Sequence, residues 1–473
     1  MHATPEILPA PYLEDPSLWL CRLRGMPHLT FFDSCHFTGN AGRYHIITAA
    51  PQQWLTLQDN QLVLCAGSPL SPSKTWHNPT DIDVWQALAE MQPKTVVSDL
   101  PFCGGLAGLL GYEFGRLAQL RRPSRSAFNF PDLAVGYYPW ALIQDNHSGT
   151  ACISILEDCH SETRAALIKA ISSADDTSFT HNSQKYRTHD QESLAADISP
   201  ADYHKAFHKI QAYLQAGDCY QINYTQRFSH ASQVSDPISL YRQLREKLPG
   251  PMAGLLAVDE ERALLSFSPE RLVSCQSNNV LAQPIKGTAP RSSDAALDRV
   301  LADKLRNSTK DQAENLMIVD LLRNDLGKVC EHGTIAVPAL FSLEHFENVH
   351  HLVSNITGKL AVNQTPLDLL EACFPGGSVT GAPKKRAMEI IDELEDFSRE
   401  AYCGSLFYLS ANDNLDANIT IRSLVASPQG LACWGGGGIT VGSEANAEYE
   451  ESLTKVTKLI KGTSPASARG QPQ

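Results

Sequence analysis

The sequence predicts a large α+β fold rather than a regular alternation of strands and helices. The chain has 473 residues, of which 42% are hydrophobic and 19% are charged, so it can bury a substantial core. Short alternating segments such as 42–49 and 62–66 predict half-buried strands, and a helical pattern near 84–91 follows them. Beyond residue 200 the patterns become longer and sharper. Strands and helices mixed in this irregular order are typical of the α+β class.

A polar segment separates the two halves of the chain. Residues 172–200 hold few large apolar side chains and show no convincing periodicity, so we interpret them as a linker. This linker divides an N-terminal region, 1–171, from a second region, 201–461. The last residues, 462–473, are rich in Pro, Ser and Gly and predict a disordered tail.

Composition argues against two classes of partner. The chain has 39 Lys and Arg residues against 52 Asp and Glu residues, a formal charge of -13, so nucleic acid is a poor partner. The longest charge-free apolar stretch, 133–143, has about half of the roughly 20 residues that cross a bilayer, so we expect no membrane association. The first residues lack a secretory signal, and the cysteines never form a C-x-x-C pair. These features predict a cytoplasmic protein with reduced thiols.

Two pairs of carboxylates recur at the i, i+3 spacing of a helix. Asp311 and Glu314 begin a helix predicted over 310–326, and Glu448 and Glu451 share one face of a later helix. A hard cation such as Mg²⁺ prefers carboxylate oxygens and completes its shell with water and substrate oxygens. Acids are also favoured by the helix dipole, so two solvated helix N-termini are the alternative interpretation.

Two glycine-rich turns could present free backbone N–H groups to an anion. They span 375–383 and 435–438, and Arg422 and Lys455 lie close to the second turn in the sequence. Neither matches the phosphate-binding pattern G-x-x-x-x-G-K-[ST], and ordinary tight turns also use glycine. Together these features favour a small dianionic ligand.

A carboxylate and an amine follow two strand-like runs. Glu270 ends one run, and Lys286 ends another. The pattern alone favours an ordinary surface ion pair.

These segments, taken together, resemble the chorismate-utilising enzymes. That family includes anthranilate synthase component I, aminodeoxychorismate synthase component I, and the isochorismate and salicylate synthases. The matching motifs are GDCYQINYTQRF from Gly217, SPERL from Ser268, PIKGTAPR from Pro284, DQAENLMIVDLLRNDLG from Asp311, HLVSNITGKL from His351, PGGSVTGAPKKRAMEIIDELE from Pro375, DANITIR from Asp416 and GGGGITVGSEANAEYEESLTK from Gly435. They follow the family's order, and the N-terminal half matches more loosely, through 33–34, 42–44 and 104–113.

The resemblance implies the large chorismate-binding fold. In that fold two mainly antiparallel sheets pack together, helices lie outside them, and both halves of the sequence contribute strands. Residues 172–200 therefore need not separate independent domains.

Two positions distinguish the reactions of this family. Enzymes that add water have a lysine where this chain has Gln221, and an amide cannot act as a general base. Aminodeoxychorismate synthases resemble P-I-K-G-T, with a nucleophilic lysine, where anthranilate synthases resemble P-I-A-G-T, and this chain has Lys286. The resemblance thus implies a component I that converts chorismate and ammonia to 4-amino-4-deoxychorismate, for para-aminobenzoate and folate biosynthesis.

The resemblance also implies a role for each site residue. Lys286 would attack C2 of chorismate and form a covalent adduct, Glu270 would protonate the departing C4 hydroxyl, and His351 would lie beside the ring. The residues that match substrate-binding positions are Gly287, Thr288, Thr380, Tyr402, Arg422, Gly436, Gly437, Gly438 and Lys455. The metal would be Mg²⁺, held by Glu314 and Glu451, with Asp311 and Glu448 behind them through water.

Two further ligands or partners follow from the resemblance. Nothing in the chain resembles the Cys-His-Glu machinery of a glutamine amidotransferase, so ammonia must come from solution or from a separate glutaminase subunit, component II, in a heterodimer. Family members hold a tryptophan, as an inhibitor or as a structural ligand. The residues that fall at that site are Ser34, Arg43, Tyr44, Met252, Ala253 and Gly254.

Two rival functions remain open at this stage. The first is an anthranilate synthase component I, against which Lys286 argues. The second is a non-catalytic subunit that binds tryptophan or a partner, against which the presence of every catalytic position argues.

Overall fold

Six segments of the chain are described in a computed structural model: 4–37, 42–67, 69–123, 126–172, 193–345 and 349–463. Most of the predicted linker, 173–192, and most of the predicted tail, 464–473, lie outside the described residues. Within the described segments, no helix combines the length and hydropathy that a membrane crossing requires.

The first of two sheets contains twelve described strands, all paired antiparallel. In spatial order they are β1 (Glu6–Ala10), β10 (Thr150–Ile155), β9 (Trp140–Asp145), β3 (Tyr44–Thr48), β2 (Thr30–Asp33), β13 (Met252–Ala257), β14 (Ala263–Ser268), β23 (Ser423–Ser427), β24 (Gly430–Ile439), β12 (Gln221–His230) and β11 (Ala195–Ala196), with β20 (Gly381–Ala382) paired to β12.

The second sheet also contains twelve described strands in antiparallel pairs. Their order is β17 (Ile285–Pro290), β19 (Val349–Lys359), β16 (Asn279–Ala282), β15 (Arg271–Gln276), β22 (Leu415–Asn418), β21 (Ser405–Ser410), β7 (Gly105–Leu110), β8 (Leu133–Tyr138), β4 (Gln53–Gln58), β5 (Gln61–Ala66) and β6 (Ser71–His77), with β18 (Ala336–His345) paired to β19.

Each sheet combines strands from both halves of the sequence. In the first sheet the halves meet where β2 pairs with β13, with Asp33 opposite Ala253. In the second they meet where β7 pairs with β21, with Leu110 opposite Ser405. The predicted α+β fold with two antiparallel sheets is confirmed.

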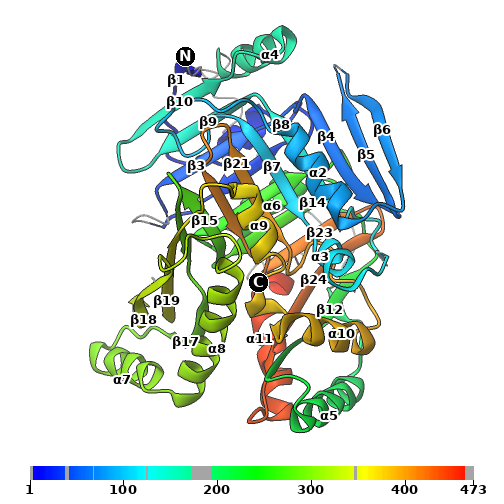
Figure 1. Ribbon diagram of the computed structural model, residues 1–473, viewed down its shortest axis with the longest axis vertical. Coiled ribbons are helices and arrows are strands. Elements are labelled where there is room, and N and C mark those ends of the chain that lie inside the picture. Colours follow the sequence, from blue (N-terminus) through cyan, green and yellow to red (C-terminus); the bar gives the residue numbers. More distant parts are fainter. Residues whose placement is uncertain are drawn as a thin grey trace, which may run out of the picture.

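Helices surround the two sheets (Figure 1). They are α1 (Leu18–Arg22), α2 (Asp81–Met91), α3 (Tyr112–Leu120), α4 (Ser161–Ser172), α5 (Pro200–Ala216), α6 (Pro237–Arg245), α7 (Ala295–Arg306), α8 (Thr309–Leu326), α9 (Pro366–Cys373), α10 (Lys384–Leu394) and α11 (Ala445–Thr463), and a 3₁₀ turn, η4, spans Gly377–Val379. Local sequence sets their ends: α8 begins after Ser308, whose hydroxyl accepts from the backbone N–H of Asp311. The predicted helices at 84–91 and 310–326 correspond to α2 and α8.

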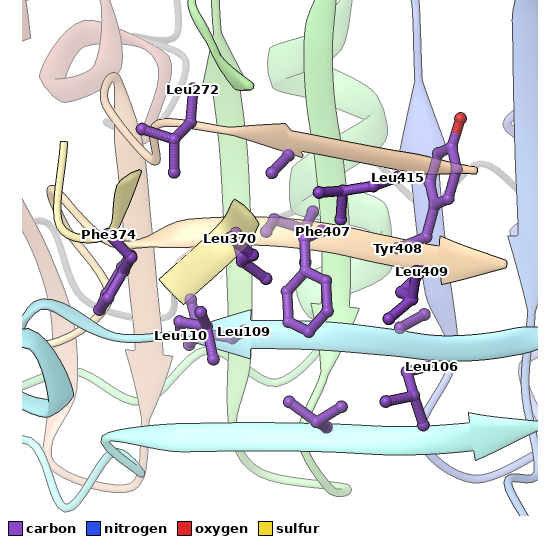
Figure 2. Close-up of a cluster of buried hydrophobic side chains, with 14 of the residues drawn as sticks. Leu106, Leu109, Leu110, Leu272, Leu370, Phe374, Phe407, Tyr408, Leu409 and Leu415 are labelled. Carbon is purple, nitrogen blue, oxygen red and sulfur yellow. The ribbon is translucent and has the colours of Figure 1, made fainter. Parts of the chain in front are cut away.

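The main core packs helices and loops against the second sheet. Figure 2 shows Leu109 of β7, Phe407 of β21 and Leu370 of α9 in this cluster, and all three side chains are fully buried. Burying one such side chain stabilises the fold by about 1.5–3 kcal/mol. This packing holds β15 and β22, and with them the loop that carries Glu270, in a fixed position.

Candidate active site

A cavity of about 1620 Å³ brings together most of the residues predicted to form the site. The predicted residues that line it are Glu270, Lys286, Gly287, Thr288, Asp311, Glu314, His351, Tyr402, Arg422, Gly436, Gly438, Glu448, Glu451 and Lys455. Thr380 and Gly437 lie outside this lining. The hydroxyl of Thr380 instead donates to the carbonyl of Gly376 at 2.9 Å, so it fixes a turn beside the cavity.

Glu270 and Lys286 approach one shared residue, Ser378. Glu270 follows β14 in the first sheet, and Lys286 lies on β17 of the second. The hydroxyl of Ser378 donates to Oε1 of Glu270 at 2.9 Å, and Nζ of Lys286 donates to the carbonyl of Ser378 at 3.2 Å. The two sheets thus present an acid and an amine to the same point of the cavity.

Burial pushes both of these groups toward their neutral forms. Burial raises the pKa of Glu270, although the Lys286 charge and the Ser378 hydroxyl oppose the rise. Burial lowers the pKa of Lys286, although the charges of Glu270 and Glu314 oppose that change. A neutral acid can donate a proton and a neutral amine can act as a nucleophile, so the arrangement suits a substitution reaction.

His351 is neutral at physiological pH. It lies on β19 opposite Thr288 of β17, and its Nδ1 is 2.9 Å from the Thr288 hydroxyl oxygen. Burial, together with the nearby charge of Arg422, lowers the pKa of His351 to about 4. The ring can therefore exchange hydrogen bonds with a ligand without adding charge to the cavity.

Arg422 supplies a positive charge to the cavity near His351. Its backbone has a left-handed φ of 51°, and its carbonyl accepts from the N–H of Phe267, which fixes the strained residue at the start of β23. Burial lowers the pKa of Arg422, and the Glu270 charge opposes this effect. Among the residues of the described segments the guanidinium forms no ion pair, so it is available to a carboxylate ligand.

The predicted metal ligands come from α8 and α11. The ammonium of Lys310 lies 3.8 Å from Oε1 of Glu314 and 3.6 Å from Oε1 of Glu448, so it connects the two helices. Burial opposes the charged form of Lys310, but the charges of nearby carboxylates, those of Glu314 and Glu448 first, outweigh it and raise the pKa of Lys310. Glu451 pairs with Lys455 at 2.7 Å, while Asp311 lies against Gly287.

The donor chemistry at this position fits a hard divalent cation. Oε1 of Glu314 is buried and accepts no hydrogen bond from the described residues, and burial raises the pKa of Glu314. Such an oxygen is stabilised by a cation. The acids do not converge, since no group of three or more His, Cys, Asp or Glu side chains in the described part of the chain forms a ready cluster. A metal here would have to draw the carboxylates of the two helices together.

Position 437, in the glycine run that precedes α11, leaves no room for a side chain. A Cβ added there would come within 3.0 Å of Oε2 of Glu448 and 3.4 Å of Oε1 of Glu451. The missing side chain therefore leaves room for both carboxylates. On the neighbouring strand the buried amide of Gln221 lies against Gly438 and has no hydrogen-bond partner in the described segments.

Tyr402 contributes an aromatic wall that the protein holds rigidly. Its ring stacks on Trp434, with centroids 5.9 Å apart and planes inclined by 10°. Burial raises the pKa of Tyr402 well above its ordinary value, so the phenol remains neutral. Lys455 reaches the same strand, because its ammonium donates to the carbonyl of Gly436 at 2.8 Å.

The residues predicted to hold tryptophan lie on or directly beside three adjacent strands, β3, β2 and β13: Ser34 follows β2 and Arg43 precedes β3. The hydroxyl of Ser34 donates to the carbonyl of Tyr44 at 2.7 Å, and Ala253 and Gly254 pair with β2. Arg43 is already paired with Asp145 at 2.8 Å. Of the six predicted residues, Arg43 and Tyr44 line the large cavity. Tryptophan binding stays a prediction.

Comparison with known proteins identifies the family. Residues 37–461 match a family model described as chorismate binding enzyme. The chain belongs to the chorismate binding enzyme family. This confirms the family resemblance of the motifs.

Relatives of this chorismate binding enzyme align over nearly its full length. Aminodeoxychorismate synthase component 1 of Klebsiella aerogenes is 42% identical over 436 residues, which cover 92% of each chain. The protein of the same name from Escherichia coli (strain K12) is 40% identical, covering 94% of this chain and 95% of that one. The crystal structure of anthranilate synthase component I from Streptococcus pneumoniae TIGR4 aligns with a TM-score of 0.75 at 27% identity, covering 90% of this chain and 93% of that chain.

Three polar residues in or beside the site escaped the sequence analysis. Ser378 belongs to the turn 375–383, from which the sequence analysis selected Thr380 and not Ser378. Lys310 precedes Glu314 by four residues, a helical spacing that could have indicated their contact. Arg399 lies outside the cavity lining and pairs with Glu395 at 2.7 Å, and because α10 ends at Leu394 no helical pattern predicts this pair.

Proposed function

We propose that this chorismate binding enzyme acts as an aminodeoxychorismate synthase component I and makes 4-amino-4-deoxychorismate from chorismate and ammonia. The observation that carries the proposal is the placement of Lys286 and Glu270 at one point of the cavity, with burial favouring the neutral form of each. The names of the Klebsiella and Escherichia relatives, which align over 92% and 94% of the chain, support it.

The proposed chemistry uses the acid and the amine in sequence. The Lys286 amine adds to C2 of chorismate, the ring double bonds shift, and the C4 hydroxyl leaves as water with the proton of Glu270. Ammonia then bonds to C4, the bond between C2 and Lys286 breaks, and a proton from the new ammonium group returns to Glu270. The products are 4-amino-4-deoxychorismate and water.

Substrate recognition falls to residues that the cavity presents around this point. Arg422 and Lys455 offer positive charge to the two carboxylates of chorismate. Thr288 and neutral His351 offer hydrogen bonds to the ring, and Tyr402 adds an aromatic side chain to the cavity wall. Dianionic chorismate thus meets cations without an added imidazolium charge.

The proposal includes Mg²⁺, with Glu314 and Glu451 as its direct ligands and Asp311 and Glu448 acting through water. Bound there, the ion would supply positive charge to the ring carboxylate of chorismate. The buried, unbonded oxygen of Glu314 and the lysine ammonium beside it support a cation at this position.

Ammonia supply completes the proposal. The relatives are named component 1, which supports a second component, and we propose that it is a glutaminase subunit acting with this chain in the cytoplasm. The purified chain should then use ammonium but not glutamine. We also propose that tryptophan binds near Ser34, Arg43, Tyr44 and 252–254.

Product identification tests the function. The purified chain, incubated with chorismate, Mg²⁺ and ammonium, should yield 4-amino-4-deoxychorismate, identified by chromatography and mass spectrometry. Anthranilate as the product would overturn the proposal in favour of an anthranilate synthase. An absence of any turnover, with tryptophan still bound, would favour a non-catalytic subunit.

A further inference from the structure

Ser378 contacts the acid and the nucleophile of the proposed reaction at the same time. Its hydroxyl donates to Oε1 of Glu270 at 2.9 Å, while its carbonyl accepts from Nζ of Lys286 at 3.2 Å. The residue lines the cavity and is 6% exposed. A hydrogen bond in such a buried place is little weakened by competition with water.

The turn that carries Ser378 is anchored from behind. Nη1 of Arg399 donates to the carbonyl of Val379 at 2.9 Å, and Nη2 donates to the carbonyl of Asn223 at 2.7 Å. Arg399 is itself held by a 2.7 Å ion pair with Glu395 and is 1% exposed. The position of Ser378 is therefore set by the fold and does not depend on a bound substrate.

We propose that Ser378 is a positioning residue whose hydroxyl determines which oxygen of Glu270 carries the transferable proton and whose carbonyl orients the amine of Lys286. This inference rests on the proposed function, in which Glu270 donates a proton and Lys286 attacks carbon.

The effect on Glu270 follows from the structure of a carboxylic acid. A neutral carboxyl group has one protonated oxygen and one acceptor oxygen. The Ser378 hydroxyl donates to Oε1, which favours Oε1 as the acceptor and places the proton on Oε2. The backbone N–H of Ile285 also donates to this carboxyl, and it is unchanged in every variant. Without the hydroxyl, both oxygens compete for the proton, and part of the neutral acid is protonated on the wrong side.

The effect on Lys286 concerns its lone pair. A neutral amine has two N–H groups and one lone pair, and rotation about its last bond turns the lone pair in any direction. Donation of one N–H to the Ser378 carbonyl restricts that rotation, which favours a single orientation of the attacking lone pair. Because this contact uses the backbone, a side-chain substitution at residue 378 leaves it in place and isolates the effect on Glu270.

The test compares Ser378→Ala, Ser378→Thr and Ser154→Ala by their rates of chorismate consumption across neutral and alkaline pH, at matched free ammonia. Ser154 is the control, because its buried hydroxyl donates to the carbonyl of Cys103 at 2.9 Å, away from the cavity. Ser378→Ala should slow the reaction about fivefold to tenfold, the effect of one lost hydrogen bond. Ser378→Thr keeps the hydroxyl and should restore most of the rate.

The pH profile separates positioning from a structural defect. Removing a donor that stabilises the Glu270 carboxylate should move the alkaline loss of activity to higher pH in Ser378→Ala. The charged groups facing Glu270, which are Lys286, Lys455 and Arg422, are unchanged in every variant. Ser154→Ala should keep the wild-type profile.

Two results would overturn the role of Ser378. One is a Ser378→Ala enzyme with the wild-type rate and profile, and the other is a slowed enzyme whose profile is unchanged. Failure of the proposed function is seen separately, because it gives a different product in the wild type, whereas these results compare variants whatever the product is.

Discussion

Two acid–base pairs of this protein are buried: Asp33 with Arg245, and Glu270 with Lys286. Of these two pairs, Asp33 and Arg245 form an ion pair, whereas Glu270 and Lys286 do not. Arg245 donates to both oxygens of Asp33, at 2.5 and 3.1 Å, and the Tyr241 hydroxyl and the backbone N–H of Cys35 donate as well. Lys286 instead directs its hydrogen bond to the carbonyl of Ser378. The comparison separates a structural pair from a reactive one.

The surroundings of the two acids shift their pKa values in opposite directions. Burial alone would raise the pKa of Asp33, but His45 and Arg245 outweigh it and hold that pKa far below its usual range. Asp33 also raises the pKa of Arg245, against the effect of burial. Around Glu270 the opposing contributions are weaker, so burial prevails and raises its pKa. Burial thus accompanies a stabilised charged pair in one place, whereas in the other it shifts the pKa of each group toward the neutral form.

The largest expected effect comes from breaking the reactive pair with Glu270→Gln. Gln keeps the size and the acceptor oxygen but cannot donate a carboxylic proton, so turnover should fall about 10²–10⁴-fold. The free energy of unfolding should stay the same or rise slightly, because the neutral form already suits the site. Steady-state kinetics and urea denaturation measure the two quantities. Near-normal turnover in this variant would remove Glu270 from its role as acid.

Asp33→Asn breaks the structural pair, and its main effect should be on the free energy of unfolding. It leaves the buried Arg245 without its counter-charge, which should lower the free energy of unfolding by about 3–5 kcal/mol. Asp259→Asn, which removes the partly exposed pair with Arg262, is the matched control and should cost about 1 kcal/mol or less. Equal losses in the two variants would contradict the structural account.

The pH dependence of stability sharpens the same contrast. The folded-state pKa of Asp33 lies below that of an unfolded Asp, about 3.9. The advantage of wild type over Asp33→Asn should therefore be constant near neutral pH and shrink as pH falls below that value. Glu270 behaves in the reverse sense, because its raised pKa means that the folded state gains stability as pH falls through it. Urea denaturation at several pH values measures both trends, and a constant difference down to strongly acidic pH would contradict the first.

The two pairs also show which features of the fold and the site could be predicted from the sequence and which could not. The helix of Asp311 and Glu314 was predictable because helical periodicity and capping are local. The contact of Asp33 with Arg245, 212 residues apart, depends on which strands and helices become neighbours, and no local pattern encodes that. The motifs pointed to Glu270 and Lys286 through family resemblance, whereas Ser378 was missed because its contacts join a turn to residues about 90 and 110 positions away.

Lys310 is intermediate between the structural pair and the reactive pair, and its substitution should have the smallest effect of those predicted here. Its ammonium lies within 4 Å of carboxylates on α8 and α11 but remains half exposed, at 55%. Lys310→Met removes this internal cation, so Mg²⁺ binding measured by calorimetry without substrate should tighten about fivefold, the effect of roughly 1 kcal/mol. Lys458→Met, which alters another exposed lysine of the cavity, should leave the affinity unchanged. Weaker binding in Lys310→Met would show that the lysine does not compete with a metal.

The central claim is that Lys286, whose pKa burial lowers, is the nucleophile of the reaction, and intact-protein mass spectrometry tests it most directly. Chorismate and Mg²⁺ without ammonia should load wild type with one covalent adduct, which peptide mapping should place on Lys286. Lys286→Ala should carry none. An unmodified wild-type chain, together with a Lys286→Arg variant that keeps much of the activity, would contradict the claim, because a permanently charged guanidinium can pair with a carboxylate but cannot attack carbon.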